Sequence, residues 1–251
     1  MHNEGMTSSY TMPDKATQQD DNSTWEQKSA LLSLFSQQME QGLDNSSLFK
    51  TLEDLYHIEP FSVLQAVAYT PKSLKIFSSF LAKNPSYQKS IVNSYNWDER
   101  FSVYGSLNAG ILMVKESRAD LLRYCVKHGL FVEWQDHRGK NLLFYVCQPE
   151  SKSQILLSSS STKAVKDAKK ETKILNYLLG LKQSKALLEK KDWSGRTAYD
   201  AFCENREIIL HRYPQNNLKE IFQEWDSMWQ KKILSQSLDV ADKAKPQPRK
   251  I

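Results

Sequence analysis

Hydrophobic positions along this chain recur at steps of three and four residues, the spacing of helices that bury one face. The first such face is made by Trp25, Leu32, Phe35 and Met39. Ser23 and Glu26 have capping-box spacing, so we expect this helix to begin at Ser23 and end near Gly42. A second helix is expected over residues 46–56. Together, residues 23–57 are predicted to cap a larger helical array, whereas residues 1–22 are polar and predicted to be disordered.

Short apolar segments then recur along the chain, each followed by a second apolar helix. The first helices are expected at FSVLQAV (61–67), FSVYGSL (101–107), NLLFYVC (141–147) and TAYDAFC (197–203). The second helices are expected at residues 73–81, 119–126, 174–179 and 207–213. Helix pairs that repeat in this way stack on their neighbours. The pattern therefore predicts an all-α solenoid of about four helix pairs over residues 58–214.

The C-terminal segment carries a further apolar stripe. Its members are Leu218, Ile221, Phe222, Trp225, Trp229 and Ile233. A terminal repeat must cover its apolar side, so residues 215–238 are predicted to form an amphipathic capping helix. The alternative is a helix that binds a partner or a membrane surface, which would require Trp225 and Trp229 to face solvent. Residues 239–251 are basic and predicted to be a flexible tail.

The stretch HGLFVEWQDHRGKNLLF, residues 128–144, resembles an ankyrin repeat. In that family a helix ends at His-Gly, an aspartate and a glycine shape the following hairpin, and an apolar run starts the next helix. The matching positions are His128, Gly129, Val132, Asp136, Gly139 and residues 141–144. Gly129 suits the left-handed end of a helix, Gly139 suits a tight hairpin, and Val132 is expected to fill the core between units.

A second match runs from Leu188 through Asp192 and Gly195 to Tyr199, with the same steps between the apolar residue, the aspartate and the glycine. The units at 61 and 101 keep only the apolar pattern, and Lys185 stands where a helix-ending glycine is expected. An insertion occupies residues 148–170, of which 158–162 are predicted to be a mobile loop. The resemblance implies a divergent ankyrin-type fold.

Composition narrows the function only slightly. The 251 residues carry a formal net charge of +5, with acidic and basic residues interspersed. The three cysteines, Cys125, Cys147 and Cys203, have no CxxC spacing and are expected to be reduced core thiols. No segment resembles a secretory signal or a membrane span, so a soluble, cytoplasmic protein is expected.

Catalytic and metal-binding motifs are missing from the sequence. The five histidines form no HExxH or HxH, and there is no GxxxxGK[ST], GxGxxG or GxSxG. We therefore expect no cofactor, no metal and no enzymatic activity. The alternative is a helical enzyme or enzyme subunit with an unrecognised site, for instance Cys125 or Cys147 paired with His128 or His137. A pocket with several convergent polar side chains would favour that alternative.

Lysines crowd the helix that leads into Ile174. They are Lys163, Lys166, Lys169, Lys170 and Lys173, and Asp167 and Glu171 lie among them. A solvated helical face explains this run, and an acidic partner is a second explanation. Nucleic acid is disfavoured because aromatic residues do not alternate with the lysines.

Repeat stacks bind proteins on the surface formed by hairpin tips and first helices. The candidate partner-binding residues are Trp134, His137, Arg138, Lys140, Lys191, Trp193 and Arg196. Trp193 beside a basic residue is typical of an interface hot spot, whereas Trp134 could equally turn inward. The degenerate repeats are similar to ankyrin proteins that intracellular bacteria deliver into host cells. That resemblance implies secretion into a host cell and a host protein as the partner.

Overall fold

A computed structural model describes the chain except residues 1–16, 97–106, 148–160, 213–217 and 244–251. The described part is mainly helical, which confirms the all-α class. The first elements are α1 (Thr17–Gln41), α2 (Asn45–Ile58), α3 (Pro60–Tyr69), α4 (Leu74–Lys83), the 3-10 helix η1 (Pro85–Tyr87) and α5 (Gln88–Val92). Two short strands, β1 (Tyr95–Asn96) and β2 (Leu107–Asn108), pair in an antiparallel register. The later helices are α6 (Ala109–Lys115), α7 (Ala119–Lys127), α8 (Leu142–Cys147), α10 (Ser161–Gly180), α11 (Ser184–Glu189), α12 (Ala198–Arg212) and α13 (Leu218–Lys243).

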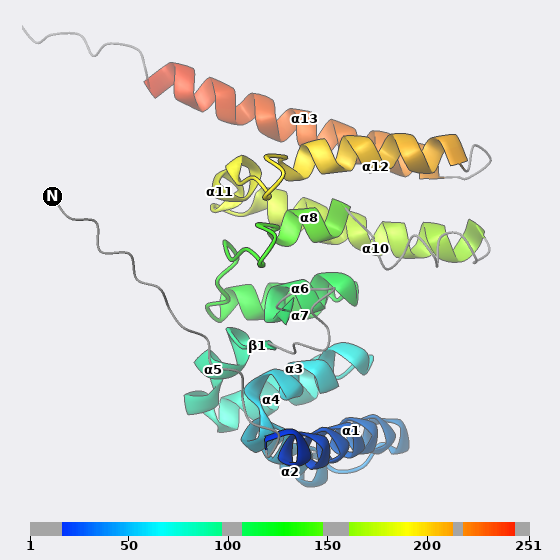
Figure 1. Ribbon diagram of the computed structural model, residues 1–251, viewed down its shortest axis with the longest axis vertical. Coiled ribbons are helices and arrows are strands. Elements are labelled where there is room, and N and C mark those ends of the chain that lie inside the picture. The colour runs from blue at the N-terminus through cyan, green and yellow to red at the C-terminus, as the bar shows by residue number, and fades with distance from the viewer. Residues whose placement is uncertain (1–16, 97–106, 148–160, 213–217, 244–251) are drawn as a thin grey trace, which may run out of the picture.

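The helices stack along the long axis of the molecule in chain order (Figure 1). One row consists of α3, α6, α8 and α12, each of which contacts the next. In the second row, α7 contacts α10 and α10 contacts α13. A single hydrophobic core runs between the rows and includes the fully buried side chains of Phe61, Phe77, Phe144 and Phe202. The two rows thus bury apolar side chains against each other and between neighbouring layers.

An arginine in the α6–α7 turn ties two layers together. The guanidinium of Arg118 donates hydrogen bonds to the backbone oxygens of Val67, Ala68 and Thr70, at 2.6, 3.2 and 3.1 Å. These oxygens lie at the C-terminus of α3, where helices leave carbonyl groups without partners and where a cation is favourable. Asp120 also pairs with Arg118, at 3.0 Å. The ends of α3 and α6 are therefore held in register.

The N-terminal pair α1 and α2 lies at one end of the stack and contacts α3. The predicted start of the first helix was wrong, because α1 begins at Thr17, so Ser23 lies inside the helix. Phe35 is fully buried as expected, but Trp25 is 53% exposed. Since α1 has 25 residues and α2 only 14, the periodic face of α1 extends past the partner that could cover it.

Three further expectations require correction. In the segment FSVYGSL, Leu107 belongs to β2, and the first helix of this unit, α6, begins only at Ala109, with Asn108 accepting the Ile111 amide at 2.8 Å. The other residues of that segment lie outside the described part. Ser161 and Thr162, expected in a loop, begin helix α10. Residues 207–212 continue α12 and do not form a second helix.

The C-terminal helix α13 packs on α10 and α12 and covers the other end of the stack (Figure 1). Trp225 and Trp229 are 2% and 0% exposed, and the Trp225 indole N–H donates to the Thr172 hydroxyl at 2.7 Å. The condition for a membrane-surface helix is therefore not met. Among the described helices, none has the length and apolar content needed to cross a membrane. Residues 239–243, predicted as flexible tail, belong to α13.

Candidate interaction surface

The first of two similar hairpins lies at residues 135–140, between α7 and α8. The carboxylate of Asp136 accepts the backbone amides of Arg138 and Lys140, both at 2.8 Å, and the Tyr145 hydroxyl at 2.6 Å. The amide of Asp136 donates to the Lys140 carbonyl oxygen at 3.0 Å and closes the turn. Gly139 has φ +76°, a conformation that glycine adopts without strain. Asp136 thus organises the turn, as its spacing to glycine predicted.

The second hairpin, at residues 191–196 between α11 and α12, repeats this geometry. Asp192 accepts the amides of Ser194 and Arg196 at 2.9 and 3.0 Å, and its own amide donates to the Arg196 carbonyl oxygen at 2.9 Å. Gly195 has φ +77°. The Arg196 guanidinium pairs with Asp192 at 2.9 Å and with Glu204 on α12 at 2.8 Å. Desolvation raises the pKa of Asp192, but its hydrogen bonds from Arg196 and Ser194 and the charge of Arg196 outweigh this and lower it.

The two hairpins pack directly against each other. The Trp193 amide donates to the Arg138 carbonyl oxygen at 2.9 Å, and the Lys190 ammonium binds the Glu133 carbonyl oxygen. A Cβ atom placed on Gly139 would lie 3.1 Å from the Asp192 Cα, closer than ordinary van der Waals contact. At Gly195 the same position meets nothing within 4 Å. The first hairpin is therefore covered by the second, and the glycine of the second hairpin is open.

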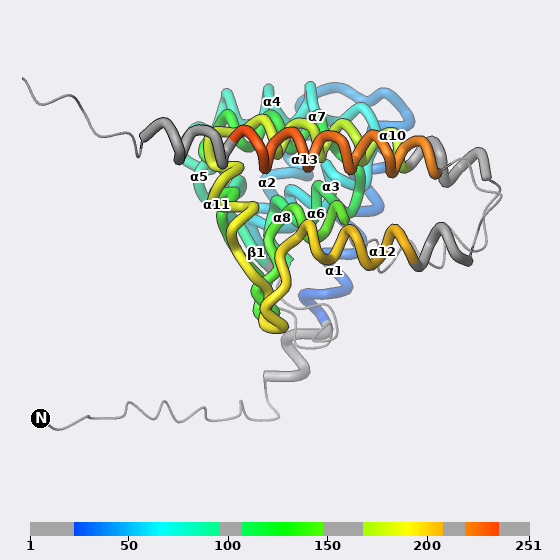
Figure 2. Tube along the Cα trace, turned by 90° about the horizontal axis from the view of Figure 1, so that it is seen from above, coloured from blue at the N-terminus to red at the C-terminus, as the bar shows by residue number. Residues whose placement is uncertain are grey.

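Helix caps fix the hairpins to the helical rows. Asn141 accepts the Leu143 amide at 3.0 Å and donates to the Leu187 carbonyl oxygen at 2.7 Å, so one buried side chain caps α8 and holds α11. At the start of α12, Asp200 accepts the amide of Thr197 at 2.8 Å and its hydroxyl at 2.7 Å. Seen along the stack, the two hairpin segments project to one side of the helical rows (Figure 2).

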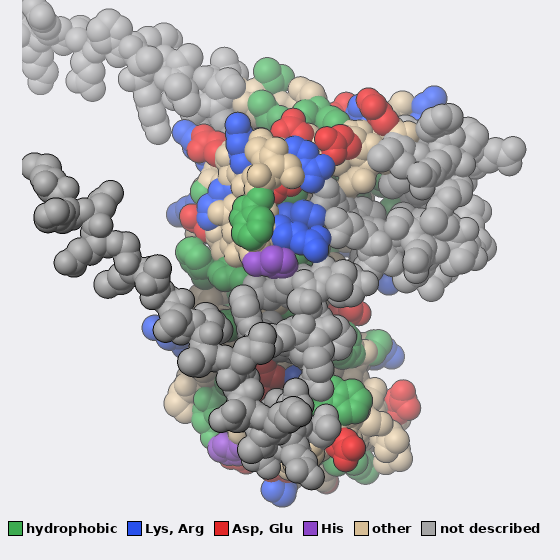
Figure 3. Space-filling view, in the orientation of Figure 1, with side chains coloured by type: hydrophobic (Ala, Val, Ile, Leu, Met, Phe, Trp, Pro, Cys, Tyr) green, Lys and Arg blue, Asp and Glu red, His purple; other side chains and the backbone are tan. Residues whose placement is uncertain are grey.

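Trp193 is the most exposed large hydrophobic residue of the described part, at 78%. The His137 ring meets it edge-on, with centroids 6.1 Å apart. Lys191 is exposed, whereas Arg138 and Arg196 are half-buried. Figure 3 shows this face, where hydrophobic, basic and histidine side chains adjoin each other. The structure thus brings five of the seven candidates together at the hairpin tips.

One candidate, Lys140, lies elsewhere than expected, and Trp134 adopts one of its two predicted alternatives. Lys140 is buried at 8% exposure, so it does not offer an accessible charge at the tip. Its amide and carbonyl oxygen are both bonded to Asp136, so it lies where the turn closes directly before the fully buried cap Asn141. Trp134 is half-buried and packs against the core, so the inward alternative describes it better.

Other exposed aromatic residues were not anticipated from the sequence. Phe131 is 59% exposed, and its amide donates to the Asn93 side chain at 2.8 Å. Tyr95 in β1 is 61% exposed. The prediction was limited to residues near the two hairpin glycines. A single aromatic residue in a loop or in a two-residue strand has no periodic pattern that would mark it in the sequence.

The alternatives based on cysteine chemistry receive no geometric support. Cys125 and Cys147 are buried, and desolvation raises both thiol pKa values far above the ordinary range. A buried thiol is a poor nucleophile because the thiolate is the reactive form. Within the described ranges, no three His, Cys, Asp or Glu side chains are grouped so that they could hold a metal ion.

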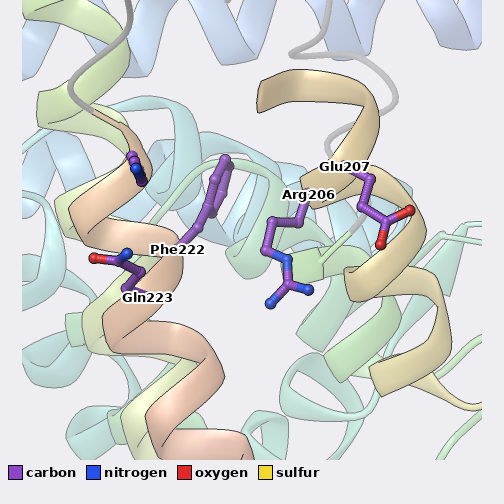
Figure 4. A pocket seen from close by; sticks show the side chains of 5 residues that line it. Arg206, Glu207, Phe222 and Gln223 are labelled. Carbon is purple, nitrogen blue, oxygen red and sulfur yellow. The ribbon is translucent and has the colours of Figure 1, made fainter. Parts of the chain in front are cut away.

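An open pocket of about 460 Å³ lies between α12 and α13 (Figure 4). It is lined by Arg206, Glu207, Lys219, Phe222 and Gln223. The Arg206 guanidinium is already paired with Asp226 at 3.2 Å and lies over the Phe202 ring. This lining carries charge, but it provides no nucleophile with an adjacent base.

Comparisons of the chain with protein-family models, with curated proteins and with solved structures found no match. Function is therefore inferred from the geometry of this chain itself.

Proposed function

We propose that this chain is a noncatalytic protein-binding module, a divergent ankyrin-type solenoid whose binding surface is the pair of hairpins at residues 135–140 and 191–196. The observation that carries the proposal is the repetition of one hairpin geometry in two packed copies, each built on an aspartate and a glycine with positive φ. Stacked helix pairs with projecting turns form extended surfaces that bind proteins.

Trp193 is the proposed anchor of the partner. Its indole is exposed, while its backbone amide is fixed to the first hairpin through Arg138. A large aromatic side chain on a rigid backbone loses little conformational freedom on binding, which is why tryptophan is enriched among residues that dominate binding energy. The Asp192–Arg196–Glu204 pairs hold the turn beneath it. We name the proposed binding surface the tip surface. It consists of Trp193, His137, Arg138, Lys191 and Arg196.

The host-cell setting implied by the resemblance is part of this proposal. The test therefore begins with capture of a partner from host-cell lysate, followed by purification of that partner and measurement of its affinity for the chain. Trp193→Ala is expected to raise the dissociation constant about thirtyfold. This corresponds to a loss of about 2 kcal/mol of binding free energy at an interface hot spot. Because Trp193 is exposed, its replacement is expected to leave the thermal unfolding midpoint unchanged.

Tyr69→Ala provides the matched control. Tyr69 is also an exposed aromatic residue, at 51%, but it ends α3 on the turn side of the helices, where Arg118 binds, and not on the hairpin side. Its replacement is expected to leave the affinity unchanged. Equal affinity of the Trp193→Ala variant and the wild-type chain, or a selective loss in Tyr69→Ala, would refute the proposed surface.

A further inference from the structure

The helices on the side of the molecule opposite the hairpins carry the excess positive charge of the chain. Figure 2 shows α4, α7 and α10 on that side, while the hairpin segments project on the other. Together these three helices contain nine basic residues and three acidic ones, Asp120, Asp167 and Glu171. This excess of six exceeds the net charge of the whole chain, which is +5. The rest of the chain is therefore close to neutral.

The three helices form one continuous layer. The Phe77 ring of α4 and the Tyr124 ring of α7 meet edge-on, with centroids 5.6 Å apart. The Arg123 guanidinium of α7 lies over the Tyr177 ring of α10, 5.4 Å from its centroid. Because neighbouring helices touch through these side chains, their outward basic residues belong to a single face, which we name the basic face.

Several ammonium groups of the basic face are available to a ligand. Its exposed basic side chains are Lys75 and Lys83 on α4, Arg123 and Lys127 on α7, and Lys169, Lys170 and Lys173 on α10. Within the ranges that the structure describes, the ammonium groups of Lys75, Lys127 and Lys173 take part in no ion pair. These three lysines come from three different helices, so the available charge is spread across the whole face.

The described carboxylates do not neutralise the basic face. Asp120 accepts two hydrogen bonds from the Arg118 guanidinium, at 3.0 and 3.1 Å, and the positive charge of Arg118 balances its own. Glu171 is 7% exposed and thus lies on the buried side of α10. Exposed carboxylates are found on the bordering helices, Glu53 on α2 and Glu224 on α13 among them. The basic face is therefore limited to α4, α7 and α10.

We propose that the basic face binds the surface of a membrane that contains anionic lipids. Such surfaces attract clusters of lysine and arginine, and each basic residue near the headgroups adds to the affinity. Lysines on three adjacent helices can meet a plane of headgroups at the same time. This inference goes beyond the proposed function, because it concerns the opposite side of the molecule. A chain bound in this way keeps Trp193 directed away from the lipid and open to a protein partner.

Other polyanions fit the basic face less well. Among the described residues, no large exposed hydrophobic side chain lies on α4, α7 or α10. Protein interfaces depend on such anchors, and single-stranded nucleic acid stacks on exposed aromatic rings. A nucleic-acid duplex is a cylinder whose grooves are read by an inserted helix or ribbon, whereas these helices lie side by side. The basic face therefore matches a planar array of negative charge best.

The test measures co-sedimentation of the whole chain with two kinds of vesicle. One is phosphatidylcholine alone, and the other is phosphatidylcholine with phosphatidylserine at a ratio of about three to one. The chain is expected to bind only the vesicles with phosphatidylserine and to be released as salt is added, because salt screens the attraction. Equal binding to both kinds of vesicle, or no binding to either, would overturn the inference.

Variants locate the binding to the basic face. Lys127→Glu and Lys173→Glu are each expected to lower the affinity for phosphatidylserine vesicles about tenfold, because each loses an attraction worth about fivefold and adds repulsion. Lys191→Glu makes the same charge change at an exposed lysine on the hairpin side and is the matched control. It is expected to change the affinity less than about twofold, since that side faces away from the lipid. An equal loss in Lys191→Glu would exclude the basic face as the site.

Competition separates lipid from nucleic acid. A short DNA duplex, added at a phosphate concentration equal to that of phosphatidylserine, is expected to leave the chain on the vesicles. Release of the chain by the duplex would assign the basic face to nucleic acid and overturn the inference. These measurements do not involve Trp193, so their failure leaves the proposed function untouched.

Discussion

Replacing Gly139 and Gly195 separately with alanine measures how much the packing of the two hairpins contributes to stability. The two residues have nearly the same backbone conformation, with φ +76° and +77°. Alanine in this left-handed conformation costs about 1–2 kcal/mol. Both variants therefore suffer the same intrinsic loss, and any difference between them comes from their surroundings.

Those surroundings differ sharply. A Cβ atom on Gly139 would lie 3.1 Å from the Asp192 Cα and 3.2 Å from the Lys191 carbonyl oxygen, whereas on Gly195 it would contact nothing within 4 Å. Since the contacted atoms are backbone, the second hairpin must give way by a few tenths of an ångström, and overpacking of this kind costs about 1–3 kcal/mol more. We expect Gly195→Ala to lose about 1–2 kcal/mol of unfolding free energy and Gly139→Ala about 2–5 kcal/mol.

Urea denaturation followed by far-ultraviolet circular dichroism measures both values. The slope of unfolding free energy against urea concentration shows whether the variants and the wild-type chain expose similar surface on unfolding. The wild-type chain and both variants are compared under one buffer condition. Equal destabilisation by the two substitutions would refute the packing of one hairpin against the other, and with it the continuous tip surface.

Three further predictions follow from other contacts. Arg118→Met is expected to lower the unfolding free energy by about 2–4 kcal/mol in urea denaturation, because it removes a charged donor from three carbonyl oxygens at the end of α3. A loss below about 0.5 kcal/mol would contradict the role of Arg118 in joining the two layers. Trp229→Ala is expected to lower the unfolding free energy by about 3–5 kcal/mol. Leu234→Ala, at a 61% exposed position on the same helix, should change it by less than about 0.5 kcal/mol. Similar losses in the two variants would show that α13 does not cap the stack. The folded pKa of Asp192 is lowered, so its ionised form adds stability above the unfolded pKa of about 3.9, and this is lost as pH falls toward the folded value. The Asp192→Asn variant should therefore show a smaller fall in unfolding free energy from pH 6 to pH 3 than the wild-type chain, and parallel profiles would exclude this role.

Local turn chemistry was predictable from the sequence because the relevant interactions lie within a few residues. Asp136 and Gly139 are three positions apart, and the carboxylate reaches amides only two and four residues ahead. The same holds for Asp192 and Gly195. The helical spacing of Trp225 and Trp229 likewise predicted a buried face. In the structure α10 and α12 contact α13 and cover this face.

Long-range neighbours were not predictable in the same way. Trp25 has the right periodicity for a buried face, but α2 is too short to cover the whole of α1. No glycine or proline interrupts the helix between Ala198 and Arg212, so α12 continues where a second helix was expected. The burial of Lys140 was not predicted, because the turn motif fixes its backbone but does not show which side chains of the turn the rest of the fold covers. The similarity of the segments at 61–67 and 101–107 led to a helix being predicted at 101–107. In the structure this helix, α6, begins later, after its cap Asn108.

Hydrogen exchange of the chain, alone and bound to its purified partner, tests the tip surface most directly. Peptide fragments that contain residues 135–140 and 191–196 are expected to exchange more slowly in the complex, because bound protein shields the exposed turns around Trp193. Fragments of α10 around Lys169 and of α13 around Leu234 should exchange at the same rate in both states. Protection confined to α10 or α13, with the two hairpins unchanged, would contradict the account.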